Sequence, residues 1–358
     1  MRKFIYPIVI SFIFLLLNAC TPAPHQPEEL KKYEFYIFGT VVGISLWDVP
    51  KEKADAVIQD IVAELQVMHK RWHAWEESSL TALNQAIATD KTWTTTDDSI
   101  IKLLELAKHY YTISNGLFNP AIGQLVKLWG FHNNKLPTGD LPVEEEIAKL
   151  VALKPTMDDV QIDKNQVYST NSAVQLDFGA FAKGYAVDLA IEQLKEAGIE
   201  NAIVNAGGNL KAIGKAGNRP WMTGLKNPIE ANKVIAAIPL EKEMAVVTSG
   251  NYERFRKYGE KRYSHIIDPR TGLPLQNPGK KLVSVTVLDE SATLADAAAT
   301  ALIVAGLDNW HKVAKQMGIK NVVLIDEEGT IYINPDMAMM IQFQPKKEPK
   351  TFITEPLR

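Results

Sequence analysis

The sequence has a single cysteine, Cys20, among 358 residues. One cysteine cannot form an intrachain disulfide or a thiolate zinc cluster, so neither can stabilise the fold. Excess charge is also lacking, because the formal net charge is -3 at pH 7 and the longest run of like charge is Glu144-Glu145-Glu146. A chain without a basic stripe is not expected to bind nucleic acid. With 46% hydrophobic residues, it can instead bury one large core or two modest ones.

The N-terminus has the organisation of a secretory signal. Two basic residues, Arg2 and Lys3, precede an apolar run over residues 4–17, which is short for a membrane span. Ala19 stands at the cleavage position and Cys20 follows at once, which resembles a bacterial lipoprotein signal. In proteins with that signal the cysteine is lipidated and becomes the mature N-terminus. We therefore expect an exported lipoprotein, anchored to a membrane and facing the periplasm or the cell exterior.

Composition divides the chain into four segments. Residues 1–19 are the expected signal peptide, and residues 20–33 are a proline-rich tether, because proline fixes φ and prevents a helix or a sheet. Residues 34–345 form one folded domain, and residues 346–358 form a loose tail. Helical and strand patterns follow one another in the domain without a strict βαβ repeat. This favours an α+β fold with a mixed sheet and packed helices over a doubly wound sheet.

Apolar periodicity predicts the elements of this domain. A first strand covers the alternating residues from Tyr33 to Leu46, with Gly39 as the place for a bulge. Helices are predicted at residues 53–69, 97–115, 143–153, 291–305 and 309–317. Further strands are predicted at residues 160–162, 166–168, 202–204, 244–250, 281–288, 321–325 and 330–333.

The stretch from Val174 to Asp188 changes its period halfway. Residues 174–178 alternate as a half-buried strand would, and the apolar residues from Tyr185 onward recur at helical spacing. Small residues lie at the change and let a ligand approach the backbone, beside one acid, Asp177, and one base, Lys183. This favours a polar ligand site. The alternative is an ordinary turn in which the two charges pair with each other or with water.

Several other patterns bear on cofactor binding. The adjacent glycines of Asn205–Asn209 fit neither the dinucleotide fingerprint nor the P-loop. His69 and His73 are four residues apart, but no third ligand follows at zinc spacing, so a solvated helix end is the better interpretation. Trp72 and Trp75 lie in a polar segment between helices, where aromatics form either a lid over the core or a platform for a planar ligand.

The helix predicted over 291–305 is almost wholly alanine and aliphatic, except for Asp296 and Thr300. These two residues are four apart, so they lie on one face of the helix. A buried aspartate needs a counter-charge, and aspartate with threonine supplies two hard oxygens of the kind that magnesium takes. A magnesium site is one interpretation, and a structural salt bridge, for example to Lys183, is the other.

Six motifs occur in order between about residues 35 and 335: Phe38–Thr40 (FGT), Leu176–Tyr185 (LDFGAFAKGY), Asn205–Gly208 (NAGG), Thr248–Gly250 (TSG), His265–Pro269 (HIIDP) and Ala295–Thr300 (ADAAAT). Together they resemble the ApbE family of FAD:protein FMN transferases. Members of that family are exported, often lipid-anchored, magnesium-dependent α+β enzymes. They split FAD and attach FMN through a phosphoester to a Ser or Thr of a partner protein. The export signal agrees independently with this resemblance.

The resemblance implies roles for individual residues. Asp296 and Thr300 would bind magnesium through their side chains, and Ala180 would bind it through its backbone carbonyl. Contacts to FAD are implied for Phe38, Trp75, the turn Leu117-Phe118-Asn119, Asp177, Lys183 and Ile267. The chain departs from the family at two positions, since many relatives carry Asp in place of Asn119 and some carry an extra acid in place of Ala299.

The implied reaction is a displacement at phosphorus, in which the protein mainly positions groups and neutralises charge. A base must take the proton of the acceptor hydroxyl. His265 is the best candidate because its unperturbed pKa is nearest neutrality, and Asp268 is the alternative. The expected partners are FAD and an acceptor protein, such as a membrane redox-complex subunit. Two rival functions are an FAD pyrophosphatase that gives FMN and AMP, and a flavin-binding lipoprotein without catalysis.

Overall fold

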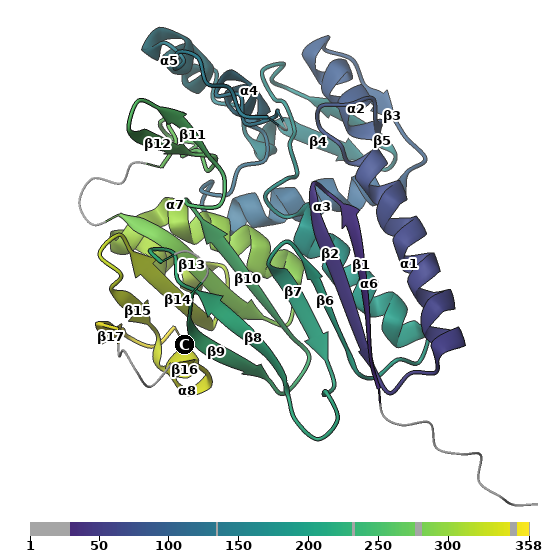
Figure 1. Cartoon of the computed structure of the whole chain (residues 1–358). Coiled ribbons are helices and arrows are strands. Elements are labelled where there is room, and N and C mark those ends of the chain that lie inside the picture. The colour runs from purple at the N-terminus through teal and green to yellow at the C-terminus, as the bar shows by residue number, and fades with distance from the viewer. Residues whose placement is uncertain (1–28, 134, 231–232, 276–280, 344–348, 358) are drawn as a thin grey trace, which may run out of the picture.

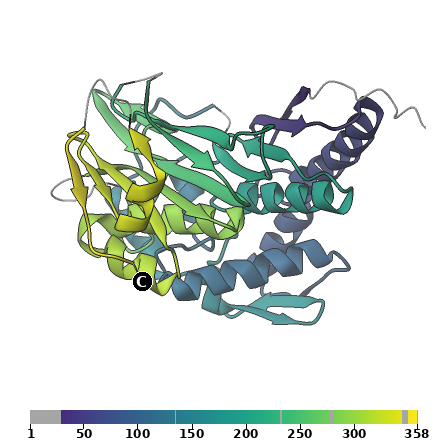
Figure 2. The ribbon, with the colours of Figure 1, turned by 90° about the horizontal axis from the view of Figure 1, so that it is seen from below.

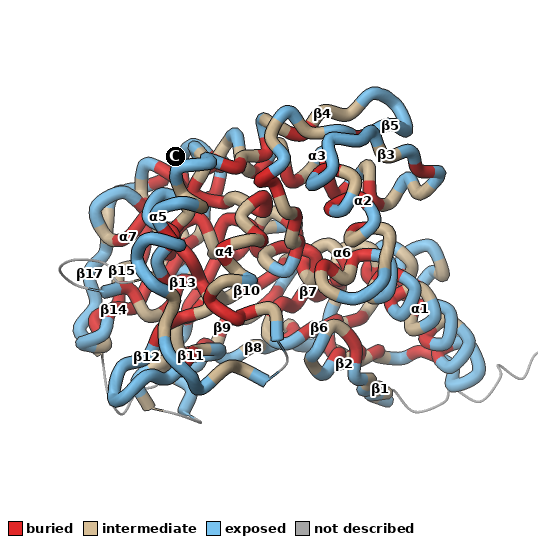
Figure 3. The backbone as a smooth tube through the Cα atoms, turned by 90° about the horizontal axis from the view of Figure 1, so that it is seen from above, coloured by how far each residue is buried: buried red, intermediate tan, exposed pale blue. Residues whose placement is uncertain are grey.

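The computed structural model describes residues 29–133, 135–230, 233–275, 281–343 and 349–357. Figure 1 shows a large sheet with helices against one face and a smaller sheet against the other. The view from below in Figure 2 separates these layers. Buried residues, red in Figure 3, gather between the large sheet and helices α1, α6 and α7. No described helix is both long and apolar enough to span a membrane.

The helices of the described chain are α1 Lys51–Arg71, α2 Ser79–Ala88, α3 Asp98–Ile113, α4 Gly123–Leu128, α5 Glu144–Ala152, α6 Ala182–Glu196, α7 Ala292–Gln316 and α8 Pro335–Met340, with a 3-10 turn at Met157–Asp159. Its strands are β1 Leu30–Ile37, β2 Thr40–Trp47, β3 Trp93–Thr94, β4 Val160–Asp163, β5 Gln166–Ser169, β6 Ala202–Ala206, β7 Asn209–Ile213, β8 Trp221–Lys226, β9 Val234–Leu240, β10 Met244–Gly250, β11 Phe255–Tyr258, β12 Lys261–Ser264, β13 Leu282–Asp289, β14 Asn321–Asp326, β15 Ile331–Ile333, β16 Gln342–Phe343 and β17 Thr351–Ile353.

The large sheet has the strand order β1-β2-β6-β7-β10-β13-β14-β15-β17 within the described residues. Neighbouring strands are antiparallel except β15 and β17, which are parallel. The expected α+β fold with a mixed sheet is therefore confirmed. The small sheet, β16-β9-β8, covers the face of β7, β10, β13 and β14 opposite the helices, where a second apolar cluster lies.

The first strand is two strands, which corrects the expectation of one bulged strand. Phe38 and Gly39 have φ of +56° and +70°, and Ile37 pairs with Thr40. Two consecutive left-handed residues make the two-residue hairpin turn that matches the twist of the flanking strands. The turn is so short that the alternating apolar pattern runs across it, and the sequence shows no interruption.

Residues 174–178 are extended and alternate in burial, but they are not a strand, so that prediction is wrong. Asn84 replaces a neighbouring strand: its amide accepts from the Leu176 backbone N–H at 2.7 Å and donates to the Leu176 carbonyl at 2.9 Å. The Asp177 N–H donates to the Pro120 carbonyl at 2.9 Å. Apolar side chains packed on alternate sides give the same period as a strand without a sheet ladder.

The ends of the domain also differ from expectation. β1 begins at Leu30, inside the range assigned to the tether, because Leu30 pairs with Trp47. The expected loose tail is wrong over Thr351–Ile353, which pairs with β15 as β17, and Leu357 is buried in the main core. The signal peptide and Cys20 lie outside the described residues, so these expectations stay predictions.

Candidate active site

Helices α6 and α7 approach each other closely at Gly184. A Cβ atom added to Gly184 would lie 2.3 Å from the carbonyl oxygen of Ala292 and 2.9 Å from the Cβ of Asp296, so only glycine fits here. The backbone N–H of Gly184 donates to Asp296 Oδ2 at 3.0 Å. The glycine of the central motif thus brings the first turn of α6, which carries Lys183, against the acid of α7.

Asp188 on α6 fixes this contact. Its carboxylate accepts from the backbone N–H groups of Ala292 and Thr293 at 3.0 and 2.9 Å, at the N-terminus of α7. It also pairs with Lys211 of β7 at 3.0 Å. An acid at a helix N-terminus is stabilised by unpaired N–H groups and by the helix dipole. Asp188 therefore ties α6, α7 and the sheet into one support for the site.

Asp296 is a buried acid with few positive neighbours. It is 4% exposed, and Asn209 donates to the same Oδ2 atom at 2.6 Å. Burial raises the pKa of Asp296 to about 6, against the Lys183 ammonium and the two hydrogen bonds, which favour the charged form. Such a carboxylate is short of positive charge and would gain from a bound cation.

Thr300 lies one turn further along α7, and its Oγ1 is 3.4 Å from Ser249 Oγ of β10. Ala180 lies in the turn that leads into α6. A carboxylate, two hydroxyls and a backbone carbonyl are hard oxygen donors, which fit magnesium. The described residues include no cluster of three His, Cys, Asp or Glu side chains able to hold a metal. A divalent cation here would therefore depend on hydroxyl and carbonyl oxygens beside one acid.

Asp177 and Trp75 are brought together, although they are far apart in the sequence. The Trp75 indole N–H donates to Asp177 Oδ2 at 3.1 Å, and the Gly179 N–H donates to Asp177 Oδ1 at 2.8 Å. Lys183 does not pair with Asp177 among the described ion pairs; its ammonium donates to the Gly179 carbonyl at 3.1 Å. Trp75 is half-buried, whereas Trp72 is buried in the main core.

His132, Arg254 and Glu253 also lie here, and sequence reasoning missed them. The His132 ring is 5.0 Å from the Trp75 ring, and its buried Nδ1 has no hydrogen-bond partner among the described residues. Burial lowers the pKa of the Arg254 guanidinium, and the Asp177 carboxylate opposes this. Burial raises the pKa of the Glu253 carboxyl, and the Lys226 and Lys183 ammonium groups oppose this. None of the three belongs to a motif, although two of them lie between the TSG and HIIDP motifs.

His265 is held by the backbone of Arg254. Its ring Nδ1 and its backbone N–H both lie 3.0 Å from the Arg254 carbonyl. A carbonyl only accepts, so the proton of the neutral ring is assigned to Nδ1, which leaves Nε2 with a free lone pair. Burial, with the nearby Arg254 and Lys183 cations, lowers the pKa of His265 to about 4. The ring is therefore neutral at pH 7 and does not titrate near neutrality as an ordinary histidine would.

Asp268, the alternative base, is already occupied. Its carboxylate pairs with the Arg270 guanidinium at 2.7 Å and accepts from the Arg270 backbone N–H at 2.9 Å. Ile267 is buried in a third apolar cluster with Trp129 and Tyr263. The HIIDP motif thus has one residue with a free polar atom, His265, beside residues that hold the turn.

The remaining residues that were predicted to contact FAD differ in how far their side chains are exposed. Phe38 is half-buried, and its ring lies 5.5 Å from that of His69. Phe118 is 1% exposed and packs edge-to-face on Phe181 at 5.5 Å, so it could reach a ligand only through its backbone. The side chain of Asn119 donates to the Pro155 carbonyl and accepts from the Ala121 N–H. These roles stay predictions.

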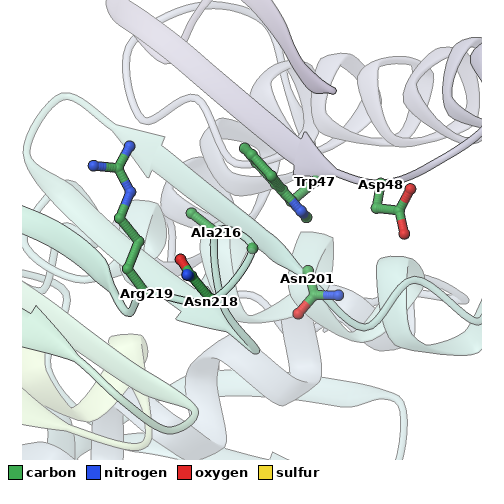
Figure 4. Close-up of a pocket in the computed structure, with 7 residues that line it drawn as sticks. Trp47, Asp48, Asn201, Ala216, Asn218 and Arg219 are labelled. Carbon is green, nitrogen blue, oxygen red and sulfur yellow. The ribbon is translucent and has the colours of Figure 1, made fainter. Parts of the chain in front are cut away.

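Of two hollows on the described surface, one is separate from this constellation and the other borders it. The larger, about 720 Å³, lies at the far end of β2, between Trp47, Asn201 and the loop 216–219, and Figure 4 shows these side chains around it. It contains none of the motif residues, so its size does not make it the candidate site. A smaller one of about 340 Å³ adjoins Trp75 and Gln175 and borders the site.

Known proteins resemble this chain in sequence and in structure. The sequence profile of the ApbE family matches residues 38–323. An FAD:protein FMN transferase of Rhodobacter capsulatus is 41% identical over 321 residues, which cover 90% of this chain and 59% of that protein, so the chain spans less than two thirds of that relative. The ApbE protein of Thermotoga maritima is 30% identical with a TM-score of 0.77, covering 87% of this chain and 99% of that one. The flavin transferase ApbE of Vibrio cholerae is 27% identical with a TM-score of 0.77, covering 88% and 100%.

Proposed function

The chain belongs to the ApbE family, and we propose that it is an FAD:protein FMN transferase. The observation that carries this proposal is the convergence of three groups from separate motifs. The Lys183 ammonium lies near both the neutral His265, with its free Nε2, and the buried Asp296 carboxylate, since its charge lowers the pKa of each group. Together they offer a proton acceptor, a cation and an acid at one place, as a displacement at phosphorus requires.

The reaction proposed is transfer of FMN from FAD to a Ser or Thr hydroxyl of an acceptor protein. The hydroxyl oxygen forms a bond to the phosphorus of the FMN half while the bond from that phosphorus to the bridging oxygen breaks. AMP leaves with the electron pair, and a phosphoester remains on the acceptor. His265 Nε2 receives the hydroxyl proton, and Lys183 offsets negative charge on the phosphates.

Magnesium dependence is part of the proposal. Asp296, Thr300 and the Ala180 carbonyl would hold the ion, with Ser249 as a further oxygen 3.4 Å from Thr300. When bound, magnesium would supply positive charge at the FAD pyrophosphate. The raised pKa of Asp296 supports this assignment, because an acid buried without enough positive charge has a use for a cation.

The flavin substrate would be held by residues around Asp177. The Trp75 and Phe38 rings are half-buried and offer apolar surfaces, and Asp177 fixes the indole of Trp75 at 3.1 Å. Leu117, Phe118, Asn119 and Ile267 would contribute contacts mainly through the shape of the pocket and their backbone, since their side chains are buried or already paired.

Export and lipid attachment at Cys20 complete the proposal. Their support is the apolar run that ends in Ala19-Cys20 and the tether that follows. The acceptor would then be a protein on the same side of the membrane, such as a membrane redox-complex subunit.

One experiment tests the activity directly. The chain from residue 29 onward is incubated with FAD, magnesium chloride and a Ser/Thr acceptor domain, and the acceptor is examined by mass spectrometry. The expected result is the added mass of FMN together with free AMP. FMN and AMP released at the same rate without any modified acceptor would show a pyrophosphatase. FAD that binds and stays intact would show a flavin-binding protein without catalysis.

A further inference from the structure

Arg254 is a charged residue near the site to which the proposed reaction gives no role. It lies in the loop between β10 and β11, and its side chain is exposed. Within the described chain its guanidinium makes one hydrogen bond, from Nη2 to the Asn133 carbonyl at 2.6 Å, and no ion pair. A guanidinium has five N–H donors in a planar fork, so most of the donors of Arg254 are free for a ligand.

The same residue holds the proposed base. The Arg254 carbonyl accepts from the backbone N–H of His265 at 3.0 Å and lies 3.0 Å from its ring Nδ1. The guanidinium also acts on that ring, because its charge lowers the pKa of His265, more strongly than the Lys183 ammonium does. Coulomb interactions weaken with distance, so the guanidinium lies near the imidazole. Arg254 and Lys183 therefore place two cations around the proposed base.

The Asp177 carboxylate is near Arg254 but does not pair with it. Its charge raises the pKa of the guanidinium, yet the ion pairs of the described residues do not include this one. Both carboxylate oxygens are already occupied, since Oδ1 accepts from the Gly179 N–H at 2.8 Å and Oδ2 accepts from the Trp75 indole at 3.1 Å. The positive charge of Arg254 is therefore available to an anionic ligand.

The Arg254 residue extends from the proposed base towards the aromatic side chains. Its Nη2 contacts Asn133, and the ring of the adjacent His132 lies 5.0 Å from the Trp75 ring, which would contact the flavin. Its carbonyl contacts His265, which would take the proton of the hydroxyl that attacks the FMN phosphorus. In FMN the phosphate is joined to the ring system by the ribityl chain. A flavin ring near Trp75 and a phosphate near His265 would therefore both lie close to Arg254.

We propose that Arg254 binds the phosphate of the FMN half of FAD through its guanidinium. The inference rests on the proposed transferase function and adds a second cation to Lys183 at the phosphates. Arginine pairs with phosphate through two parallel N–H···O bonds, which fix the orientation of the phosphate as well as offset its charge. Arg254 would thus hold the phosphorus in front of the hydroxyl that His265 deprotonates.

The test replaces Arg254 by methionine, which is long and flexible but uncharged. Equilibrium dialysis measures the Kd of FMN and of riboflavin, which differ only in the phosphate, and the Kd of FAD without added magnesium. The wild type is expected to bind FMN more tightly than riboflavin. In Arg254→Met the ratio of the two affinities is expected to fall about 10- to 100-fold, and FAD binding with it, while riboflavin binds as in wild type. Arg254→Lys keeps the charge without the fork and is expected to give an intermediate ratio.

Arg219→Met is the matched control, because Arg219 is also exposed and lines the larger hollow of Figure 4, which contains none of the motif residues. Its affinities are expected to equal those of the wild type. An unchanged ratio in Arg254→Met would overturn the inference, and so would an equal loss of FMN and riboflavin, which would place the guanidinium at the ring. A wild type that binds FMN no more tightly than riboflavin would also overturn it. A wild type that binds no FAD would overturn the proposed function itself.

Discussion

His265 is the residue on which the proposed chemistry depends most. With a pKa of about 4 it stays a neutral base from about pH 5.5 to 8, so at saturating magnesium and FAD the transfer rate is expected to be flat over that range. His265→Asn is expected to lower the rate about 100- to 10,000-fold, the usual contribution of a positioned base, while FAD still binds. Rapid-quench transfer assays and equilibrium FAD titration measure the two effects separately.

Asp268→Asn is the control for that prediction. Because Asp268 is paired with Arg270, its loss is expected to lower the melting temperature rather than to remove a base. A rate that rises with pH through about 6.5 in the wild type and becomes flat in His265→Asn would contradict the low pKa. The free energy of unfolding provides a second measure of the low pKa of His265. Between about pH 6.5 and 4 the unfolded chain takes up a proton at His265 that the native chain does not. The free energy of unfolding is therefore expected to decrease as the pH is lowered through this range, by at most about 1.4 kcal/mol per pH unit.

Substitution of Asp296 distinguishes a metal ligand from an acid with a purely structural role. Asp296→Asn keeps an oxygen that can accept from Gly184 and Asn209, so the fold is expected to be retained. A ligand that binds only the native state raises its stability, so magnesium should raise the melting temperature of the wild type and not that of the variant. Turnover is expected to be lost. Equal magnesium-dependent stabilisation of both proteins would show that Asp296 holds no metal, whatever happens to activity.

Gly184 carries the contact between two helices, so its substitution acts on the elements rather than on one side chain. In Gly184→Ala the added methyl group would meet the Ala292 carbonyl, and α6 and α7 must separate. Overpacking of this kind costs about 1–3 kcal/mol. Urea unfolding measures this loss, and magnesium titration measures the accompanying displacement of Asp296 from Lys183. Gly139→Ala is the control, since nothing lies within 4 Å of its added Cβ and its φ is ordinary. Equal stability of the two variants would mean that the helices tolerate the side chain.

The helices that the sequence predicted are those in which an apolar repeat is sustained over several turns. Helix α7 begins after Ser291, whose side chain accepts from the Leu294 N–H, and Gly306, with φ of 71° and ψ of 177°, interrupts it between the two predicted helices. The hairpin turn and residues 174–178 were misread because alternation reports burial on alternate sides and not hydrogen bonding to a strand. The short strand β17 has too few residues to show a pattern.

The candidate site shows the same limit. Asp296, Thr300 and Lys183 stand out because a charge or hydroxyl interrupts an apolar or small-residue stretch. His132, Glu253 and Arg254 lie in polar loops, where a polar residue carries no signal. The low pKa of His265 depends on burial and on the nearby Arg254 and Lys183 cations, and neither can be read from a linear spacing.

On the scale of the whole molecule, the main prediction concerns Cys20. Cys20→Ser is expected to release the protein from the membrane fraction while the purified domain keeps its transfer activity, because the described fold begins only at Glu29. Fractionation followed by an activity assay measures both effects. Mass spectrometry of the wild-type membrane fraction is expected to find an N-terminus at lipidated Cys20. An intact segment from Met1 through Cys20 in that fraction would contradict the lipoprotein assignment.

The position at which the chain enters the fold limits the distance between a membrane anchor and the active site. Glu29 lies beside Asp48, whose N–H donates to its carbonyl at 3.3 Å, whereas the Phe38 turn lies at the other end of β1 and β2, as Figure 1 shows. Residues 20–29 span at most about 30 Å, and eight strand residues span about 26 Å. A lipid on Cys20 would therefore confine the catalytic end to within roughly 60 Å of the bilayer. An upright molecule would modify hydroxyl groups on segments that stand well above the headgroups, and those nearer the lipid would be reached only if it leaned over.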